Sequence, residues 1–331
     1  MRLVTYRHPR TGEQARAGVV QGDRILDVAR LTDDALPNDM LALLTRGPDA
    51  LTQLKGATTT FARQFAEAAE VPPDVALARW EATLLAPIPR PPAFRDFYAF
   101  EQHVVTAYTR RGRPVPATWY RLPVFYYGHT GTFFGPEVAI PKPAETRELD
   151  FELEIACIIG RTGRDIAVEE AEGYIAGYAI LNDWSARDVQ REEMTVGLGP
   201  AKGKDFATSL GPWLVTPDEL AARQRDGRLH LGMVARVNGE TLTEANTATM
   251  HWTFAEMIAR ASADVPLEPG DIIGSGTVGG GCILELGPER HPWLEPGDEV
   301  ELDVERLGRL RNTIALPENG GETDAAPPDG G

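Results

Sequence analysis

The chain contains 331 residues, of which 42% are hydrophobic and 25% are charged, the proportions of an ordinary soluble globular protein. Its formal net charge of −16 repels phosphate backbones and anionic lipids, which argues against nucleic acid and membranes as partners. A small anionic substrate would therefore need local cations or a metal ion to hold it. The first residues lack the apolar segment of a signal peptide and no run reaches the length of a membrane span, so we expect a cytoplasmic protein.

The composition along the chain predicts three parts. Residues 1–86 are expected to form a small N-terminal β/α domain, because strand-like alternation around a Gln21-Gly22-Asp23 hairpin turn precedes helical spacing from Pro37 onward. A proline-rich run at its end marks the boundary of a larger domain over residues 87–315. Residues 316–331 are polar and rich in glycine and proline, which predicts a disordered tail.

The two cysteines, Cys157 and Cys282, both lie in apolar runs that are typical of strands. Such positions favour small core side chains over a disulfide framework. We therefore expect two free thiols in a reducing compartment.

A group of carboxylates marks the centre of the chain. In the segment Leu149–Ile155, Glu152 and Glu154 alternate with apolar residues, so they point to the same side of a predicted strand. Asp183 follows an apolar run at the point where a second buried strand ends. Hard oxygen ligands without cysteine or histidine suit Mg²⁺, Ca²⁺ or Mn²⁺ rather than zinc. The alternative is a solvated outer face of a strand.

The segment after the proline-rich run carries a candidate acid–base residue. We expect a helix that begins at Asp96 and ends at Gly112, with one apolar stripe. Asp96 and His103 are seven residues apart, which is about two helical turns, so both side chains can face one cleft. The alternative for His103 is a helix histidine that is satisfied by a nearby carbonyl group.

Two further stretches could border a ligand. Residues 119–137 are dense in aromatic residues and glycine, which fits either a pocket for a planar ligand or ordinary core. The glycine-punctuated loop 199–206 presents Lys202 and Lys204 just downstream of the carboxylates. A lysine beside a metal site can neutralise a substrate carboxylate or an oxyanion, although most lysines are simply solvated.

A third glycine-rich stretch matches the dinucleotide fingerprint by letter at Gly274, Gly276 and Gly279. We reject a nucleotide site because the strand-like run 282–286 follows it where that motif requires a helix, and because the motif lies late in the chain and not after a first strand. A tight loop whose backbone approaches a ligand fits better, with Thr277 in the loop and Glu285 on the strand beyond.

Several motifs together resemble the fumarylacetoacetate hydrolase superfamily over residues 94–310. They are Asp96-Phe97-Tyr98 with His103, LDFELEIA, NDWSARDVQ, GKDFATSLGPW, and LEPGDIIGSGT followed by LEL. The resemblance implies an α+β, mainly β fold, a mixed β-sheet roll of the fumarylacetoacetate hydrolase type. It also implies a homodimer and a catalytic Mg²⁺, with Ca²⁺ or Mn²⁺ as alternatives.

The resemblance also assigns roles to individual residues. The implied metal ligands are Asp96, Glu152, Glu154 and Asp183. The implied catalytic residues are His103, Glu285, which polarises it, and Lys204. The implied substrate contacts are Tyr98, Tyr126, Gln190 and Thr277.

The chain departs from the fumarylacetoacetate hydrolase pattern where substrate is bound. Met194 stands where that enzyme has a tyrosine, and His129 replaces an arginine. The substrate-binding arginine has no direct counterpart, although Arg110 and Arg111 are near. The substrate is therefore less well specified than the catalytic residues.

We accordingly expect a hydrolase that cleaves a carbon–carbon bond in a diketo acid of the fumarylacetoacetate, fumarylpyruvate or acylpyruvate type, as in aromatic catabolism. His103 would take a proton from water, and the hydroxide would attack a carbonyl group. Lys204 and Gln190 would support the oxyanion. One alternative is a decarboxylase, tautomerase or isomerase acting on 2-oxo acids such as oxaloacetate. The other is a metal-stabilised binding protein without catalysis.

Overall fold

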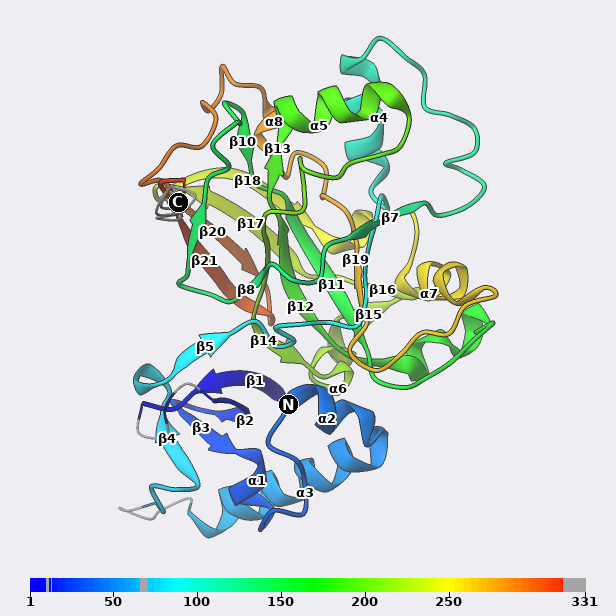
Figure 1. Ribbon diagram of the computed structural model, residues 1–331. Coiled ribbons are helices and arrows are strands. Elements are labelled where there is room, and N and C mark those ends of the chain that lie inside the picture. Colours follow the sequence, from blue (N-terminus) through cyan, green and yellow to red (C-terminus); the bar gives the residue numbers. More distant parts are fainter. Residues whose placement is uncertain (10–11, 13, 66–70, 318–331) are drawn as a thin grey trace, which may run out of the picture.

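The computed structural model describes residues 1–9, 12, 14–65 and 71–317 (Figure 1). Among these residues the largest sheet has twelve strands, ten of them in the order β4-β3-β2-β1-β14-β12-β11-β19-β6-β7. A second sheet has the order β18-β17-β20-β21-β9. The expectation of a mixed, mainly β fold is therefore confirmed. Almost all of the predicted tail lies outside the described residues.

The N-terminal part extends the large sheet. It contains β1 (Arg2–Arg7), β2 (Ala15–Gln21), β3 (Arg24–Asp27), β4 (Ala76–Ala78), β5 (Thr83–Leu85), α1 (Val28–Leu31), α2 (Met40–Thr45) and α3 (Pro48–Gln64). Gln21 pairs with Arg24, which confirms the predicted hairpin turn. Leu3 pairs with Leu214 of β14, so this part shares a sheet and a core with the rest of the molecule.

The rest of the large sheet carries the site, and three of its strands are buried on both faces. The strands of this part are β6 (Phe94–Phe97), β7 (Phe125–Gly128), β8 (Phe133–Phe134), β11 (Leu153–Ile159), β12 (Ile175–Asp183), β14 (Thr208–Val215) and β19 (Ile272–Gly274). Every residue of β11, β12 and β14 is buried, which explains their nearly continuous apolar runs. Glu154 is therefore in the interior of the sheet, and the alternative of a solvated outer face is wrong.

The second sheet shows the alternation expected when one face packs on the core. Its strands are β9 (Ala139–Pro141), β17 (Gly232–Val237), β18 (Glu240–Asn246), β20 (Glu299–Val304) and β21 (Gly308–Ala315). In β17 and β20 buried residues alternate with half-buried ones. Two pairs of short strands complete the β structure: β10 (Leu149–Asp150) with β13 (Ser185–Ala186), and β15 (Gln224–Arg225) with β16 (Arg228–Leu229).

The remaining helices are α4 (Glu101–Arg110), α5 (Arg187–Glu193), α6 (Pro217–Leu220), α7 (Phe254–Ser262) and α8 (Ile283–Leu286). Short 3₁₀ turns are η1 (Arg79–Glu81), η2 (Val168–Tyr174), η3 (Met194–Val196), η4 (Ala221–Arg223) and η5 (Thr247–Thr249). Helices α4, α5 and α8 gather at one end of the molecule in Figure 1. In the described part of the chain, no helix is long and apolar enough to cross a membrane.

Two predicted elements are wrong. Asp96 does not begin a helix, because it lies in β6, which pairs with β19 on one side and β7 on the other. The helix starts later, at Glu101. The run 282–286 is not a strand, because Ile283 begins α8 and Glu285 lies on that helix. Cys282 accordingly precedes a helix of four residues. One ground for rejecting the nucleotide motif therefore does not hold, whereas its late position in the chain is unchanged.

Candidate functional site

Three of the predicted metal ligands converge near the β7 edge of the large sheet. Asp96 comes from β6, Glu154 from β11 and Glu152 from the position just before β11. All three are buried, and carboxylate oxygens from each lie within 4.8 Å of one another. Strand β19 lies between β6 and β11 and holds them at this spacing.

Gly274 lets these carboxylates approach. It is the residue of β19 that pairs with Asp96, and a Cβ atom there would stand 2.2 Å from Asp96 Oδ1 and 3.4 Å from Glu154 Oε2. The next glycine, Gly276, donates its N–H to Asp96 Oδ1 at 3.2 Å. It has a φ of +75°, which glycine adopts readily. The backbone of this loop therefore approaches the carboxylates themselves.

Asp183, at the end of β12, lies beside this group and is joined to it by Lys204. The Nζ atom of Lys204 is 2.7 Å from Glu152 Oε2 and 2.6 Å from Asp183 Oδ2. Tyr126 donates its hydroxyl hydrogen to the same Asp183 oxygen. Lys204 is buried, so the alternative of a solvated lysine is wrong.

Two oxygens of the cluster have no hydrogen-bond partner among the described residues. They are Glu154 Oε2 and Asp183 Oδ1, and both are buried. Buried carboxylate oxygens are costly unless a donor or a cation satisfies them. An all-oxygen donor set of this kind suits Mg²⁺, Ca²⁺ or Mn²⁺. The residues present therefore fit the divalent cation that the sequence predicts.

The electrostatics of the cluster also favour a cation. Burial, reinforced by Asp183 and Glu152, raises the pKa of Asp96 well above its usual value, and burial and neighbouring carboxylates do the same for the pKa of Glu154. Burial alone would raise the pKa of Glu152, but Lys204 and Arg187 outweigh it and hold that pKa low. The negative charge at the site thus exceeds what its buried cations balance, and a divalent ion would relieve the repulsion.

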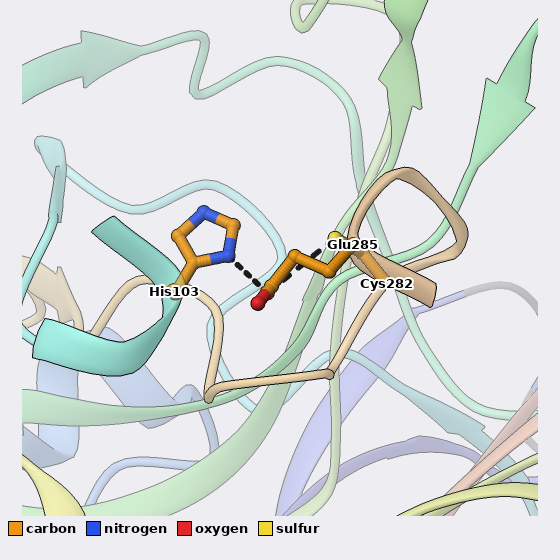
Figure 2. A group of neighbouring side chains, drawn as sticks. All are labelled: His103, Cys282 and Glu285. Atoms are coloured by element: carbon orange, nitrogen blue, oxygen red, sulfur yellow. Dashed lines mark hydrogen bonds and ion pairs between the residues drawn. The ribbon is translucent and has the colours of Figure 1, made fainter. Parts of the chain in front are cut away.

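His103 and Glu285 form a pair on neighbouring elements. His103, on α4, contacts a Glu285 carboxylate oxygen through Nδ1 (Figure 2). The other Glu285 oxygen accepts the N–H of Gly280 at 3.0 Å, and Arg110 donates to the Glu285 carbonyl oxygen at 2.8 Å. His103 is thus not satisfied by a carbonyl group, and the pairing leaves Nε2 as the ring nitrogen for a substrate.

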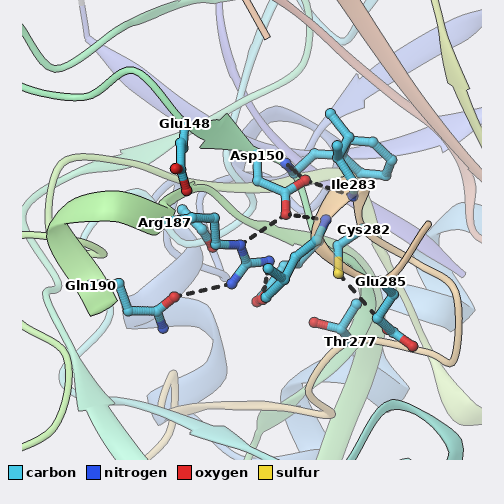
Figure 3. A network of polar contacts seen from close by, with 12 residues as sticks. Glu148, Asp150, Arg187, Gln190, Thr277, Cys282, Ile283 and Glu285 are labelled. Atoms are coloured by element: carbon cyan, nitrogen blue, oxygen red, sulfur yellow. Dashed lines mark hydrogen bonds and ion pairs between the residues drawn. The ribbon is translucent and has the colours of Figure 1, made fainter. Parts of the chain in front are cut away.

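Two residues that the sequence did not single out, Arg187 and Asp150, connect the cluster with this pair. Arg187, the first residue of α5, donates to Asp150 at 2.8 Å and to Glu152 at 2.8 Å (Figure 3). Asp150 in turn accepts the backbone N–H groups of Ile283 and Leu284, at 2.8 and 3.0 Å. The signal was present, since both residues lie inside the motifs LDFELEIA and NDWSARDVQ.

One cavity of about 300 Å³ brings most of the predicted site together. The predicted residues that line it are Asp96, Tyr98, His103, Tyr126, Glu152, Gln190, Lys204 and Thr277. The other three, Glu154, Asp183 and Glu285, are buried but do not line it. Arg111 and Met194 also line the cavity, whereas Tyr127 and His129 are exposed away from it.

Comparison with known proteins relates this arrangement to a family. Residues 93–315 match the family model described as fumarylacetoacetate (FAA) hydrolase C-terminal. The chain is 33% identical over 325 residues to the rat mitochondrial oxaloacetate tautomerase Fahd2a, covering 95% of this chain and 91% of the relative. It is 32% identical to the human mitochondrial oxaloacetate tautomerase FAHD2A, with the same coverage.

Solved structures are similar over nearly the whole chain. A fumarylacetoacetate hydrolase from Exiguobacterium antarcticum has a TM-score of 0.70 and 26% identity, covering 96% of this chain and 99% of that one. A maleylpyruvate hydrolase from Sphingobium sp. SYK-6, in complex with manganese(II) and pyruvate, has a TM-score of 0.68 and 26% identity, covering 96% and 100%.

Proposed function

Because the chain belongs to the fumarylacetoacetate hydrolase family, we propose that it is a divalent-metal-dependent tautomerase, which interconverts the keto and enol forms of a 2-oxo acid of the oxaloacetate type. The observation that supports acid–base chemistry at this site is the His103–Glu285 pair, whose imidazole lines the same cavity as Asp96 and Glu152. The full-length similarity to oxaloacetate tautomerases favours this reaction over the hydrolysis expected from the sequence.

The residues that would hold the metal are Asp96, Glu152, Glu154 and Asp183. When bound, a divalent ion such as Mg²⁺, Mn²⁺ or Ca²⁺ polarises the 2-oxo group and stabilises the negative charge of an enolate. Lys204 and Gln190, which line the cavity, supply a cation and a polar amide for the substrate carboxylate.

In this proposal His103 transfers the proton. Nε2 takes a proton from the carbon next to the carbonyl group, and the imidazolium returns it to the carbonyl oxygen, which completes the change from keto to enol. Glu285 holds the ring through Nδ1 and stabilises the imidazolium while it exists. The reaction consumes no water, and no bond between carbon atoms breaks.

Hydrolysis of a diketo acid is the second candidate, since the similar Sphingobium structure is a maleylpyruvate hydrolase. In that reaction the same His103 would take a proton from water, and Lys204 and Gln190 would support the tetrahedral oxyanion. The two candidates use the same residues and differ in whether a water molecule reaches the carbonyl carbon.

The deciding experiment follows the products. Purified protein with Mg²⁺ or Mn²⁺ is incubated with oxaloacetate, fumarylacetoacetate, fumarylpyruvate and acylpyruvates, with and without a chelator. We expect chelator-sensitive relaxation of the oxaloacetate enol absorbance without release of acids or carbon dioxide. Two acids from a diketo substrate would establish the hydrolase, and carbon dioxide from oxaloacetate would establish a decarboxylase. Either result without tautomerase activity would overturn the proposal.

Replacing His103 tests the assigned base. We expect His103→Ala to lose at least about 100-fold in kcat, because general acid–base catalysis contributes about that much or more. Binding of Mn²⁺, measured by calorimetry, should persist because the carboxylates are unchanged. His129→Ala is the control, since His129 is exposed outside the cavity and its loss should leave kcat unchanged. Full activity of His103→Ala would contradict the assignment.

A further inference from the structure

A second group of potential metal ligands lies beside the carboxylate cluster. In the part of the chain that the structure describes, this group consists of His103, Cys282 and Glu285. One potential ligand atom of each residue lies within 4.8 Å of the other two, and all three residues are buried. The proposed reaction uses His103 and Glu285 but leaves Cys282 without a role.

One oxygen of Glu285 is the centre of this group. His103 Nδ1 contacts Glu285 Oε1, and Cys282 Sγ lies 3.8 Å from the same oxygen (Figure 2). Cys282 stands immediately before α8 and Glu285 lies within it, so one short segment fixes both. Asp150 holds the start of this segment through two backbone N–H groups. A potential ligand atom on α4 thus faces two from the segment 282–285, whose start is held by Asp150.

The donor set differs chemically from the carboxylate cluster. It combines sulfur, imidazole nitrogen and one carboxylate oxygen, which suits borderline and soft ions, whereas the cluster around Asp96 offers only hard oxygens. The 3.8 Å between Sγ and Oε1 is near the edge of a tetrahedron with a metal–sulfur bond of about 2.3 Å and a metal–oxygen bond of about 2.1 Å.

We propose that His103, Cys282 and Glu285 form a second cation site, which takes thiophilic divalent ions such as Zn²⁺, Cd²⁺ or Co²⁺ and is inhibitory when occupied. The ion binds between His103 and Glu285, whose hydrogen-bonded atoms must move apart to admit it, and so removes the base. The cavity gives access, since His103 and the neighbouring Leu284 line it, and a solvent molecule from the cavity completes four-fold coordination.

The protons balance. Binding breaks the S–H bond of Cys282 and forms a metal–sulfur bond, and the thiol proton leaves to solvent. The proton on His103 Nδ1 moves to Nε2, which frees the Nδ1 lone pair for the ion. Glu285 is a carboxylate before and after. An imidazole that is bound to metal through Nδ1 and protonated on Nε2 can no longer take a proton from a substrate.

The test of binding uses spectroscopy and needs no substrate. Chelator-stripped full-length protein is saturated with Mg²⁺ and titrated with Co²⁺, and the thiolate-to-cobalt charge-transfer band in the near ultraviolet is recorded. We expect the band in the wild type and in Cys157→Ala, which removes the other buried cysteine, and its loss in Cys282→Ala. Absence of the band from the wild type, or its persistence in Cys282→Ala, would overturn the proposal.

The test of inhibition uses Mg²⁺-saturated enzyme and added Zn²⁺, with each protein normalised to its own rate without zinc. We expect Cys282→Ala to need at least about tenfold more zinc for half-inhibition than the wild type and Cys157→Ala. Cys282→Ser, which keeps the size of the side chain, is the second variant if Cys282→Ala does not fold. Equal zinc sensitivity of all variants would overturn the inhibitory role. Because the cobalt spectrum is independent of turnover, a wrong proposed function leaves that test intact.

Discussion

Single glycines decide whether the carboxylate cluster can form. We expect Gly274→Ala to lower the affinity for Mn²⁺ by at least about tenfold, because the new Cβ atom would stand 2.2 Å from Asp96 Oδ1 and must push that carboxylate aside. Calorimetric titration of the folded variant measures this loss. Gly173→Ala is the control, since nothing lies within 4 Å of a Cβ atom there and the residue is exposed. Unchanged affinity in Gly274→Ala would show that the cluster does not bind the ion.

The site residues that could be predicted from the sequence are those whose role follows from their spacing along the chain. Glu152 and Glu154 share a strand period, and the structure brings both to the cluster with Asp96. Arg187 was missed because its partner Asp150 lies 37 positions away and the two meet only once the fold has formed. A charged residue beside an apolar run is often simply exposed to solvent. The role of such a residue can be recognised only once the groups that it contacts in the fold are known.

Helix α8 shows how an element with little intrinsic stability is held in place. The helix has four residues, too few to be stable alone, and no side chain of its own caps it. Asp150 accepts hydrogen bonds from the first two backbone N–H groups of the helix and from the side chain of Arg187. The position of Glu285 therefore depends on a carboxylate from a distant strand.

Replacing that carboxylate tests the dependence. We expect Asp150→Asn to lower the free energy of unfolding by about 1–3 kcal/mol, because it weakens charge-assisted hydrogen bonds to α8 and to buried Arg187. We also expect kcat to fall, since Glu285 loses its fixed position. Denaturant titration and kinetics measure the two effects. Glu169→Gln, at an exposed carboxylate on η2, should change neither. Normal stability and kcat in Asp150→Asn would remove Asp150 from this role.

Helix α1 begins at a carboxylate whose titration should be visible in the stability of the protein. Asp27 accepts hydrogen bonds from Tyr6 at 2.7 Å, from the N–H of Arg30 at 3.0 Å and from Arg16 at 2.9 Å. Burial alone would raise the pKa of Asp27, but the hydrogen bonds outweigh it and lower that pKa. A lowered pKa means that the ionised carboxylate stabilises the fold above its unfolded pKa of about 3.9, and that this contribution is lost as the pH falls through the folded value.

We therefore expect Asp27→Asn to reduce the free energy of unfolding by about 1–3 kcal/mol at neutral pH, and the difference from the wild type to shrink as the pH falls below about 4. Denaturant unfolding across this range measures both. Asp23→Asn, in the exposed turn between β2 and β3, should match the wild type throughout. A difference that stays constant with pH would exclude titration of Asp27 as its source.

The hairpin, which depends on its own turn residues, was predicted correctly. The two elements that depend on contacts with distant parts of the chain, β6 and α8, were not. The hairpin between β2 and β3 follows from its own turn residues. Asp96 reads locally as a helix start, but pairing of β6 with two neighbouring strands overrides this preference. The run at α8 carries an apolar pattern too short to separate helix from strand, and the hydrogen bonds from its first backbone N–H groups to the distant Asp150 are not visible in the local sequence.

Across the whole molecule, one sheet runs from the N-terminal strands to the candidate site. Strand β1 pairs with β14, which pairs with β12, whose last residue is Asp183. The division of the chain at residues 86 and 87 stays a prediction, although strand pairing crosses it. Metal removal or substitution at the carboxylate cluster should therefore change the stability of the large sheet.

Removal of the metal should therefore destabilise the whole protein. A ligand that binds only the folded state at 100 times its dissociation constant stabilises it by about 2.7 kcal/mol, and here it would also relieve repulsion among buried carboxylates. We expect a chelator to lower the Tm of Mg²⁺-saturated protein by a few degrees and excess Mg²⁺ to restore it. Scanning calorimetry measures the shift.

Glu154→Gln is the matched variant, because it keeps the size of a side chain whose Oε2 has no partner among the described residues and removes one buried charge. The chelator should leave its Tm nearly unchanged, and its Tm should exceed that of the chelated wild type because less charge is buried. If the chelator shifts the variant as much as the wild type, the stabilising ion is bound elsewhere. If the chelator shifts the Tm of neither protein although Mg²⁺ binds, the bound ion does not stabilise the folded state. The expected coupling between the carboxylate cluster and the stability of the large sheet would then be wrong.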